Sequence, residues 1–271
     1  MEKQLGVGST SCVGIIGVGN MGEALLAALI AAGQSPESIC FAEKRDERAV
    51  EITTKYGAIR KELTEINECD VILLVVKPQD LVTTLEALNS SAPKSYISFV
   101  AGKTIATIEA NVPAGSSVIR VMPNTPALIG KGMSALSRGS ATKDADMAFA
   151  LHFLSASGKA VEVPESAQDA VTATSGSGPA YFFAFVEAMV DGAMELGLTR
   201  EIATELTVQT IIGAAGMLEQ SGKDAKTLRE NVTSPNGTTA AALASFNEAG
   251  LPKMVAAAMK AAADRSAELS K

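Results

Sequence analysis

A short polar turn near the end of the chain carries residue types that suit the binding of a small anion. The turn, residues 234–239, reads SPNGTT and runs into an alanine-rich segment that is predicted to be a helix. Proline and glycine end the preceding helix, and Thr238 or Thr239 is expected to cap the one that follows. The first N–H groups of a helix lack partners within it and carry the positive end of its dipole. The turn is therefore predicted to bind a small anion, such as a carboxylate, without a lysine or arginine.

A second candidate binding segment is a glycine turn near the start of the chain. The β-branched run Val13–Ile16 precedes residues 17–22, which read GVGNMG, and a helical pattern follows. In such a turn Gly17 allows the tight bend, Gly19 lets a pyrophosphate approach the backbone, and Gly22 lets the helix pack on the strand. The predicted cofactor contacts of this turn are Gly17, Gly19, Asn20, Met21 and Gly22.

Three charged residues after the second predicted strand leave the choice of cofactor open. The strand Ser38–Ala42 ends at Glu43, about 20 residues past the glycine turn, where an acidic side chain usually holds the adenosine ribose hydroxyls. Glu43 favours NAD, because a carboxylate repels a 2′-phosphate. Lys44 and Arg45 favour NADP if they pair with that phosphate, but they could also be solvated residues that open the next helix. At least one of the three is expected to contact the cofactor.

Strands continue to alternate with helices through the first half of the chain. The later expected strands are Asp70–Val76, Tyr96–Val100, Ser117–Val121, Gly132–Ser137 and Lys159–Val163. This alternation indicates a parallel, doubly wound sheet, in which ligands bind beyond the carboxyl ends of the strands. The loops at those ends should line one crevice, and they add further candidate cofactor-binding residues: Val76, Lys77, Pro78, Ala101, Gly102, Asn124 and Thr125.

The pattern changes to helices beyond Pro164. Ser175-Gly176-Ser177-Gly178-Pro179 opens a helix over Ala180–Leu196, and more helices are expected over Arg200–Gln220, Asp224–Val232, Thr239–Glu248 and Leu251–Ser270. The first of these helices is apolar nearly all round, which predicts burial in a core or a subunit interface. The helices form a thin layer alone, and dimerisation could bury their remaining apolar surface.

Composition excludes several classes of partner. The chain has 271 residues and a net charge of −7, without a cluster of lysine and arginine, so nucleic acid and anionic membranes are poor candidate partners. No segment is apolar over the length of a membrane span. Residues 1–11 have no apolar core, so they are expected to form a loose tail and not a signal peptide.

Cys12, Cys40 and Cys69 lack metal-ligand spacing and are expected to be reduced thiols in the cytoplasm, and no metal site is predicted. The single histidine, His152, lies in a helix away from the strand ends and is interpreted as structural.

Several motifs resemble those of a known family. In chain order they are the glycine turn, Val76-Lys77-Pro78, VMPNTP at 121–126, SGSGPA at 175–180 and NVTSPNGTT at 231–239. Together they closely resemble pyrroline-5-carboxylate reductases, the last enzymes of proline biosynthesis, over nearly the whole chain beyond the tail. Many dehydrogenases share the first motif, whereas the last two are highly specific to this family. One departure is Asn236, where many members have glycine, but asparagine tolerates left-handed backbone geometry.

The resemblance implies transfer of a hydride from a reduced nicotinamide cofactor, NADP with NAD left open, to the C=N carbon of 1-pyrroline-5-carboxylate, which gives L-proline. It places the substrate carboxylate on the backbone N–H groups of Gly237, Thr238 and Thr239, with the Thr239 hydroxyl near the ring nitrogen as the candidate catalytic group. The implied substrate-binding residues are Ser234, Gly237, Thr238, Thr239, Ser175, Gly176 and Ser177. It also implies a homodimer formed through the helical domain, with larger assembly left open.

The expected fold is α/β, with a Rossmann-like doubly wound sheet over residues 12–164 and an all-helical substrate and dimerisation domain over residues 165–271. Two other functions stay open. A dehydrogenase of the 3-hydroxyacid or 6-phosphogluconate type would need a catalytic lysine in the helical domain, but Lys159, Lys223 and Lys226 lie outside the long apolar helices. The other is a non-catalytic nucleotide-sensing or scaffold protein that keeps a cofactor fold, but a scaffold would need neither the glycine turn nor the anion turn.

Overall fold

The computed structural model describes residues 11–270. Apart from Ser11, the tail expected over residues 1–11 lies outside the described residues. The described chain divides into two compact units: unit 1 contains residues 11–177 and 262–270, and unit 2 contains Gly178–Ala261. Each unit is described by itself below. The domain boundary expected between residues 164 and 165 stays a prediction.

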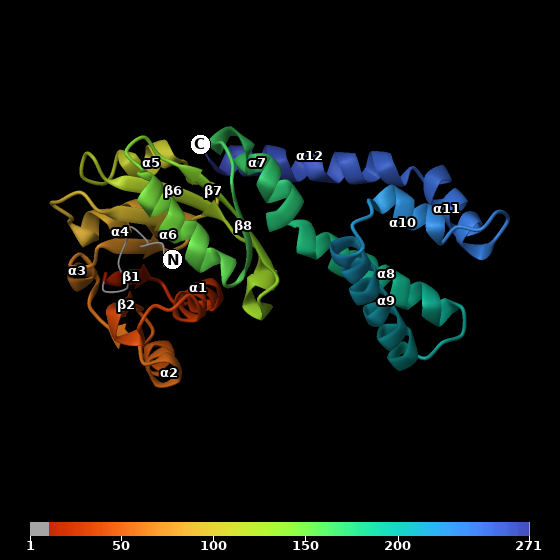
Figure 1. Cartoon of the computed structure of the whole chain (residues 1–271), viewed down its shortest axis with the longest axis horizontal. Coiled ribbons are helices and arrows are strands. Elements are labelled where there is room, and N and C mark those ends of the chain that lie inside the picture. Colours follow the sequence, from red (N-terminus) through yellow and green to blue (C-terminus); the bar gives the residue numbers. More distant parts are fainter. Residues whose placement is uncertain (1–10, 271) are drawn as a thin grey trace. The chain divides into compact units, whose positions relative to one another are not determined.

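Unit 1 is built on one eight-stranded sheet with the order β3-β2-β1-β4-β5-β6-β7-β8 (Figure 1). The strands are β1 (Val13–Ile16), β2 (Ile39–Ala42), β3 (Ile59–Arg60), β4 (Val71–Leu74), β5 (Ser95–Ser98), β6 (Ser117–Met122), β7 (Gly132–Arg138) and β8 (Gly158–Glu162). The first six strands are parallel, β7 is antiparallel to β6, and β8 is parallel to β7. The short connection from β6 to β7 accounts for the reversal, because a parallel neighbour needs a longer crossover. The predicted doubly wound sheet is confirmed as a mostly parallel one.

Helices cover both faces of this sheet. One hydrophobic cluster joins the strands to α1 (Asn20–Ala31), α2 (Asp46–Tyr56) and α6 (Asp144–Ser155). The other joins them to α3 (Leu63–Ile66), α4 (Leu81–Leu88) and α5 (Ile105–Glu109). Ile15 lies in the first cluster and its neighbour Ile16 in the second, because successive strand residues point to opposite faces. The strands are therefore buried on both sides, which explains their continuous apolar runs.

The last part of unit 1 joins two distant segments of the chain. Helix α7 (Gln168–Val171) continues into a π-helical turn over Thr172–Gly176, directly before unit 2 begins. The end of the C-terminal helix α12 (Leu251–Leu269) belongs to unit 1, where the Ser266 hydroxyl donates a 2.7 Å hydrogen bond to Asp169 Oδ1 on α7. Sequence reasoning did not find α7 or the π-helical turn.

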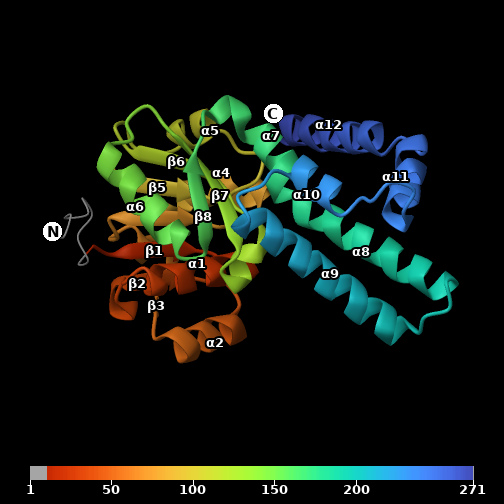
Figure 2. The same ribbon diagram turned by 45° about the vertical axis from the view of Figure 1, so that its right-hand side comes forward.

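Unit 2 is helical, as predicted, and exposes much apolar surface. Its helices are α8 (Gly178–Glu195), α9 (Arg200–Gln220), α10 (Ala225–Asn231), α11 (Thr238–Glu248) and the first part of α12. Figure 2 shows α8 and α9 packed along one another. Large apolar side chains remain exposed in the single chain, among them Phe182, Phe183, Leu196, Leu206 and Ile212. Within the described residues, none of the helices combines the length and apolar character that a membrane span requires.

The cysteines differ from the expectation of three reduced thiols. The structure joins Cys12 and Cys69 in a disulfide, with their Cα atoms 4.7 Å apart, and leaves Cys40 as a buried free thiol. The expectation was wrong for Cys12 and Cys69 because it considered each cysteine alone. The two residues lie just before β1 and β4, and these strands are neighbours in the sheet, so the fold brings distant cysteines within bonding reach.

Candidate active site

The glycine turn between β1 and α1 has the shape of an anion cradle. Gly17 has a φ of +94°, and a Cβ there would lie 2.6 Å from the carbonyl oxygen of Val75. A Cβ at Gly22 would overlap the carbonyl of Gly17, so neither position accepts a larger residue. Space is open where a Cβ of Gly19 would lie, and Gly19 caps α1 without a side-chain hydrogen bond. The open space and the free N–H groups of α1 fit a dinucleotide pyrophosphate.

Glu43 is tied to the glycine turn. Its side chain is 8% exposed, Oε2 accepts a 3.3 Å hydrogen bond from the Val18 N–H, and Oε1 accepts one of 3.0 Å from Arg45 Nε. The hydrogen bond from Arg45 is the main cause that lowers the pKa of Glu43, against the opposing effect of burial. Glu43 therefore carries its negative charge close to the turn. Arg45 lies mostly in solvent, and Lys44 is exposed beside it.

Two residues that sequence reasoning missed also support the turn. Arg48 on α2 donates a 2.8 Å hydrogen bond from Nε to the Val18 carbonyl and pairs through Nη2 with Glu23 on α1. Glu23 also accepts from Lys55 Nζ at 2.7 Å and from the Tyr56 hydroxyl at 2.9 Å. These bonds, that from Lys55 first, lower the pKa of Glu23 to about 2. The sequence offers one signal for this network, which is that Glu23 directly follows Gly22. The side chains that pair with Glu23 come from α2, and a local sequence pattern does not predict how α2 packs against α1.

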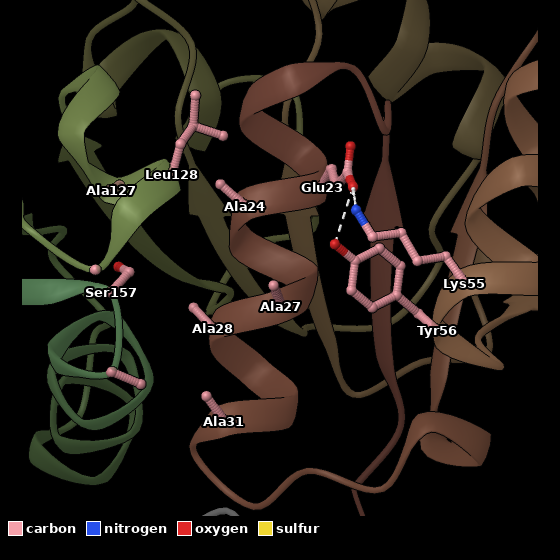
Figure 3. Close-up of a pocket in the computed structure, with 12 residues that line it drawn as sticks. Glu23, Ala24, Ala27, Ala28, Ala31, Lys55, Tyr56, Ala127, Leu128 and Ser157 are labelled. Carbon is pink, nitrogen blue, oxygen red and sulfur yellow. Dashed lines mark hydrogen bonds and ion pairs between the residues drawn. The ribbon is translucent and has the colours of Figure 1, made fainter.

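The Glu23 network borders a cavity of about 350 Å³ beside α1 (Figure 3). Small side chains of α1 form one wall, and residues near β7 and β8 form the opposite wall. The lining residues are Glu23, Ala24, Ala27, Ala28, Ala31, Lys55, Tyr56, Ala127, Leu128, Gly130, Ala156 and Ser157. None of them is among the predicted cofactor-binding residues, although Glu23 directly follows Gly22 of the glycine turn.

The other predicted cofactor loops follow strands that are neighbours in the sheet. Val76, Lys77 and Pro78 come after β4, which lies beside β1, and Ala101 and Gly102 come after β5. Asn124 and Thr125 follow β6. The sheet therefore brings these loops to the same edge as the glycine turn. Gly102 has a φ of +71°, and a Cβ there would meet Leu269 of α12 at 3.0 Å, so the C-terminal helix covers this loop.

Asn124 links the loop after β6 to the serine–glycine motif. Its Nδ2 donates to the Ser175 carbonyl at 3.3 Å and to the Ser175 hydroxyl at 3.2 Å, while Oδ1 accepts from the Met133 N–H at 2.8 Å. Gly176 leaves room for the terminal methyl group of Met122, which a side chain at 176 would displace. A predicted cofactor loop and part of the predicted substrate wall, Ser175–Ser177, are therefore in direct contact in unit 1.

The anion turn of unit 2 has the predicted form with one correction. The Gly237 N–H donates to the Ser234 carbonyl at 3.0 Å, and Asn236 adopts a left-handed conformation with a φ of +58°. The N-cap of α11 is Gly237, which has extended backbone and no capping side chain, so the expected cap by Thr238 or Thr239 was wrong. Both threonines lie in the first turn of the helix instead. The first N–H groups of α11 thus face no capping side chain, and Thr239 is half-buried.

His152 belongs neither to the predicted cofactor loops nor to the anion turn. It is an exposed residue of α6, and its Nε2 lies 3.3 Å from the carbonyl oxygen of Ala32 at the end of α1. This contact joins two helices on one face of the sheet, in keeping with the structural role expected for this residue.

Comparison with known proteins gives the family. Residues 165–269 match the family described as pyrroline-5-carboxylate reductase dimerisation, and residues 12–102 match one described as NADP oxidoreductase, coenzyme F420-dependent. The pyrroline-5-carboxylate reductase of Corynebacterium melassecola is 41% identical over 96% of this chain and 98% of its own length. The chain belongs to the pyrroline-5-carboxylate reductase family. The reductase of Pseudomonas aeruginosa is 40% identical over 97% of this chain and 98% of its own length.

Solved structures agree with this assignment. A pyrroline-5-carboxylate reductase from Coxiella burnetii superposes with a TM-score of 0.90 at 33% identity and covers 97% of this chain and 99% of its own. The pyrroline carboxylate reductase of Plasmodium falciparum, solved with NADP bound, gives 0.85 at 28% identity over 97% of this chain and 99% of its own.

The family assignment decides between the functions that the sequence left open. The protein is an NAD(P)H-dependent pyrroline-5-carboxylate reductase of proline biosynthesis, with an NADP-binding domain. The expected enzyme class, fold and cofactor are confirmed, and the hydroxyacid dehydrogenase and the non-catalytic sensor are set aside. Family membership with a dimerisation domain implies a homodimer.

Proposed function

We propose that residues 234–239 bind the carboxylate of 1-pyrroline-5-carboxylate and that the Thr239 hydroxyl contacts the ring nitrogen. The observation that carries this proposal is the N-terminus of α11, an 11-residue helix without a side-chain cap. Gly237 suits the position because a Cβ there would overlap the Ser234 hydroxyl. A carboxylate would satisfy the first N–H groups of α11 and gain from the helix dipole.

We propose that the cofactor binds along the edge of the sheet where β1, β4, β5 and β6 end. The N-terminus of α1 would hold the pyrophosphate, and Glu43 and Arg45 would lie at the adenosine ribose. When bound, the reduced nicotinamide supplies the hydride that reduces the C=N carbon. The protonated imine is already electrophilic, so the chain's task is to hold the reactants in line and not to provide a strong acid or base.

The role of Thr239 follows from this division of tasks. A hydroxyl that donates to, or accepts from, the ring nitrogen would orient the C=N bond and hold the proton that remains on the nitrogen of proline.

The residues Ser175–Ser177, held by Asn124, are proposed as a second part of the substrate wall. The homodimer is proposed to form through the helices of unit 2, whose apolar side chains Phe182 and Phe183 are exposed in the single chain.

Substitution at position 239 tests the proposal. Thr239→Val keeps the shape of the side chain and removes its hydroxyl, so we expect kcat to fall about tenfold to a hundredfold while the Kd of NADPH stays the same. Thr239→Ser keeps the hydroxyl and should retain most of the turnover. Steady-state kinetics with both substrates and fluorescence titration of NADPH measure these values.

A matched control lies on α9 in the same unit. Thr204 is exposed, and its hydroxyl donates only within the helix, to the Arg200 carbonyl. Thr204→Val should therefore leave the kinetics unchanged. A Thr239→Val enzyme that turns over normally, or that loses cofactor affinity as much as it loses turnover, would show that Thr239 has a structural role.

A further inference from the structure

Three sulfur atoms meet at the edge of the sheet opposite the predicted cofactor loops. Cys12 comes directly before β1, Cys40 is the second residue of β2, and Cys69 comes just before β4. Since β1 lies between β2 and β4 in the sheet, the three residues converge at the starts of these strands. Their Sγ atoms all lie within 4.8 Å of one another, and those of Cys12 and Cys40 are 3.8 Å apart.

The three sulfurs differ in access and surroundings. Cys12 is partly exposed, whereas Cys40 and Cys69 are 4% and 0% exposed. Burial raises the pKa of the Cys40 thiol, and the nearby Lys61 ammonium opposes this only in part. The Lys94 ammonium donates a 2.9 Å hydrogen bond to the Cys69 carbonyl and so brings a positive charge to that side of the cluster. A reagent in solution therefore reaches Cys12 first, and Cys40 stays a neutral thiol behind it.

We propose that Cys12, Cys69 and Cys40 form a thiol–disulfide exchange site that reacts with small-molecule disulfides. The Cys12 thiolate attacks a disulfide RSSR, which forms a Cys12–SR bond and releases RS⁻. The Cys69 thiolate then attacks the Cys12 sulfur, closes the Cys12–Cys69 bond and releases the second RS⁻. Two protein thiols lose two electrons and two protons, and one RSSR becomes two RSH.

Cys40 is a third thiol, to which the existing disulfide can be transferred without any further oxidation of the protein. In its thiolate form it can attack the Cys12 sulfur, so that a Cys12–Cys40 bond forms, the Cys12–Cys69 bond breaks and Cys69 leaves as a thiolate. Because Cys40 is mostly protonated at neutral pH, this exchange is the slower one. The Cys12–Cys69 bond is thus the main product.

The bond encloses the part of the chain that carries the glycine turn, β2 and Glu43. Its sequence separation is 57 residues, so closing it removes many conformations from the unfolded chain. The sulfurs lie away from the predicted cofactor edge. Oxidation should therefore strengthen unit 1 against unfolding and leave NADPH affinity unchanged.

The test uses the full-length protein equilibrated in mixtures of reduced and oxidised glutathione. Peptide mass spectrometry should find the Cys12–Cys69 bond at oxidising ratios, with a Tm raised by roughly 5–10 °C and reversed by dithiothreitol. Cys12→Ser should abolish both effects. Cys40→Ser should keep the Cys12–Cys69 bond and remove any Cys12–Cys40 linkage.

Two results would overturn the proposal. One is a protein whose thiols stay free at oxidising ratios, or that forms mixed disulfides with glutathione without an internal bond. The other is tight stoichiometric binding of Zn²⁺ or Cd²⁺ that needs all three cysteines and protects them from oxidation, which would make the cluster a metal site instead.

Discussion

At the scale of single residues, Glu43 acts both as a charge and as a structural link. Its two carboxylate oxygens accept hydrogen bonds from the glycine turn and from Arg45. The sequence left open whether Glu43 disfavours NADP or Arg45 favours it. In the structure these two side chains form one ion pair, so their effects on cofactor preference are coupled. Any group that draws Arg45 away from Glu43 must compete with that carboxylate.

This ion pair predicts how charge removal changes cofactor choice. Glu43→Gln keeps a hydrogen-bond acceptor for the Val18 N–H but removes the negative charge and frees the Arg45 guanidinium. We expect the ratio of kcat/KM for NADPH to that for NADH to rise about tenfold, since one charge near a phosphate is worth roughly 1–2 kcal/mol. Arg45→Met should move the ratio in the opposite direction. An unchanged ratio in both variants would place these side chains away from the 2′-phosphate.

At the scale of elements, the sequence was informative wherever one segment carried its own signal. The apolar run of β4 and the glycine turn were both readable locally. Helix α7 and the π-helical turn were not, because their residues 168–176 are mixed in polarity and too short to show a period. The bonds of Asn124 to Ser175 and of Arg48 to Val18 join distant segments, so only the folded chain reveals them.

The bond from Asn124 to Ser175 predicts a link between the loop after β6 and the π-helical turn. Asn124→Asp keeps the acceptor for the Met133 N–H but replaces the donor with a carboxylate oxygen that repels the Ser175 carbonyl. A lost hydrogen bond with an unpaired acceptor costs about 1–3 kcal/mol, so we expect kcat/KM for pyrroline-5-carboxylate to fall about tenfold. Steady-state kinetics measure this change.

The control is the same change in another element. Asn111, in the turn just after α5, also donates from Nδ2 to a backbone carbonyl, that of Thr107, at 2.8 Å. Asn111→Asp should cost similar stability by thermal unfolding without changing kcat/KM. If the two variants lose activity equally, the Asn124 bond contributes to stability alone.

At the scale of the whole molecule, the two units differ in how they bury apolar surface. Unit 1 has two clusters of buried apolar side chains on the faces of its sheet. Unit 2 buries few apolar side chains, among them Val190 and Ala203, and leaves many large ones exposed. Helices that leave many large apolar side chains exposed in the single chain are typical of a subunit interface. The sequence could predict that these helices need a partner surface, but not which side chains remain uncovered.

A pair of matched substitutions tests where the dimer forms. Phe183 on α8 and Val50 on α2 are both 64% exposed in the single chain, so glutamate at either site meets the same solvent access in a monomer. In a dimer formed through unit 2, Phe183→Glu would bury a charge without a partner, which costs several kcal/mol per subunit. Light scattering after size exclusion should then show monomers with greatly reduced activity, whereas Val50→Glu should stay dimeric and active. Dimers that persist in Phe183→Glu, or that are lost in Val50→Glu, would move the interface away from α8.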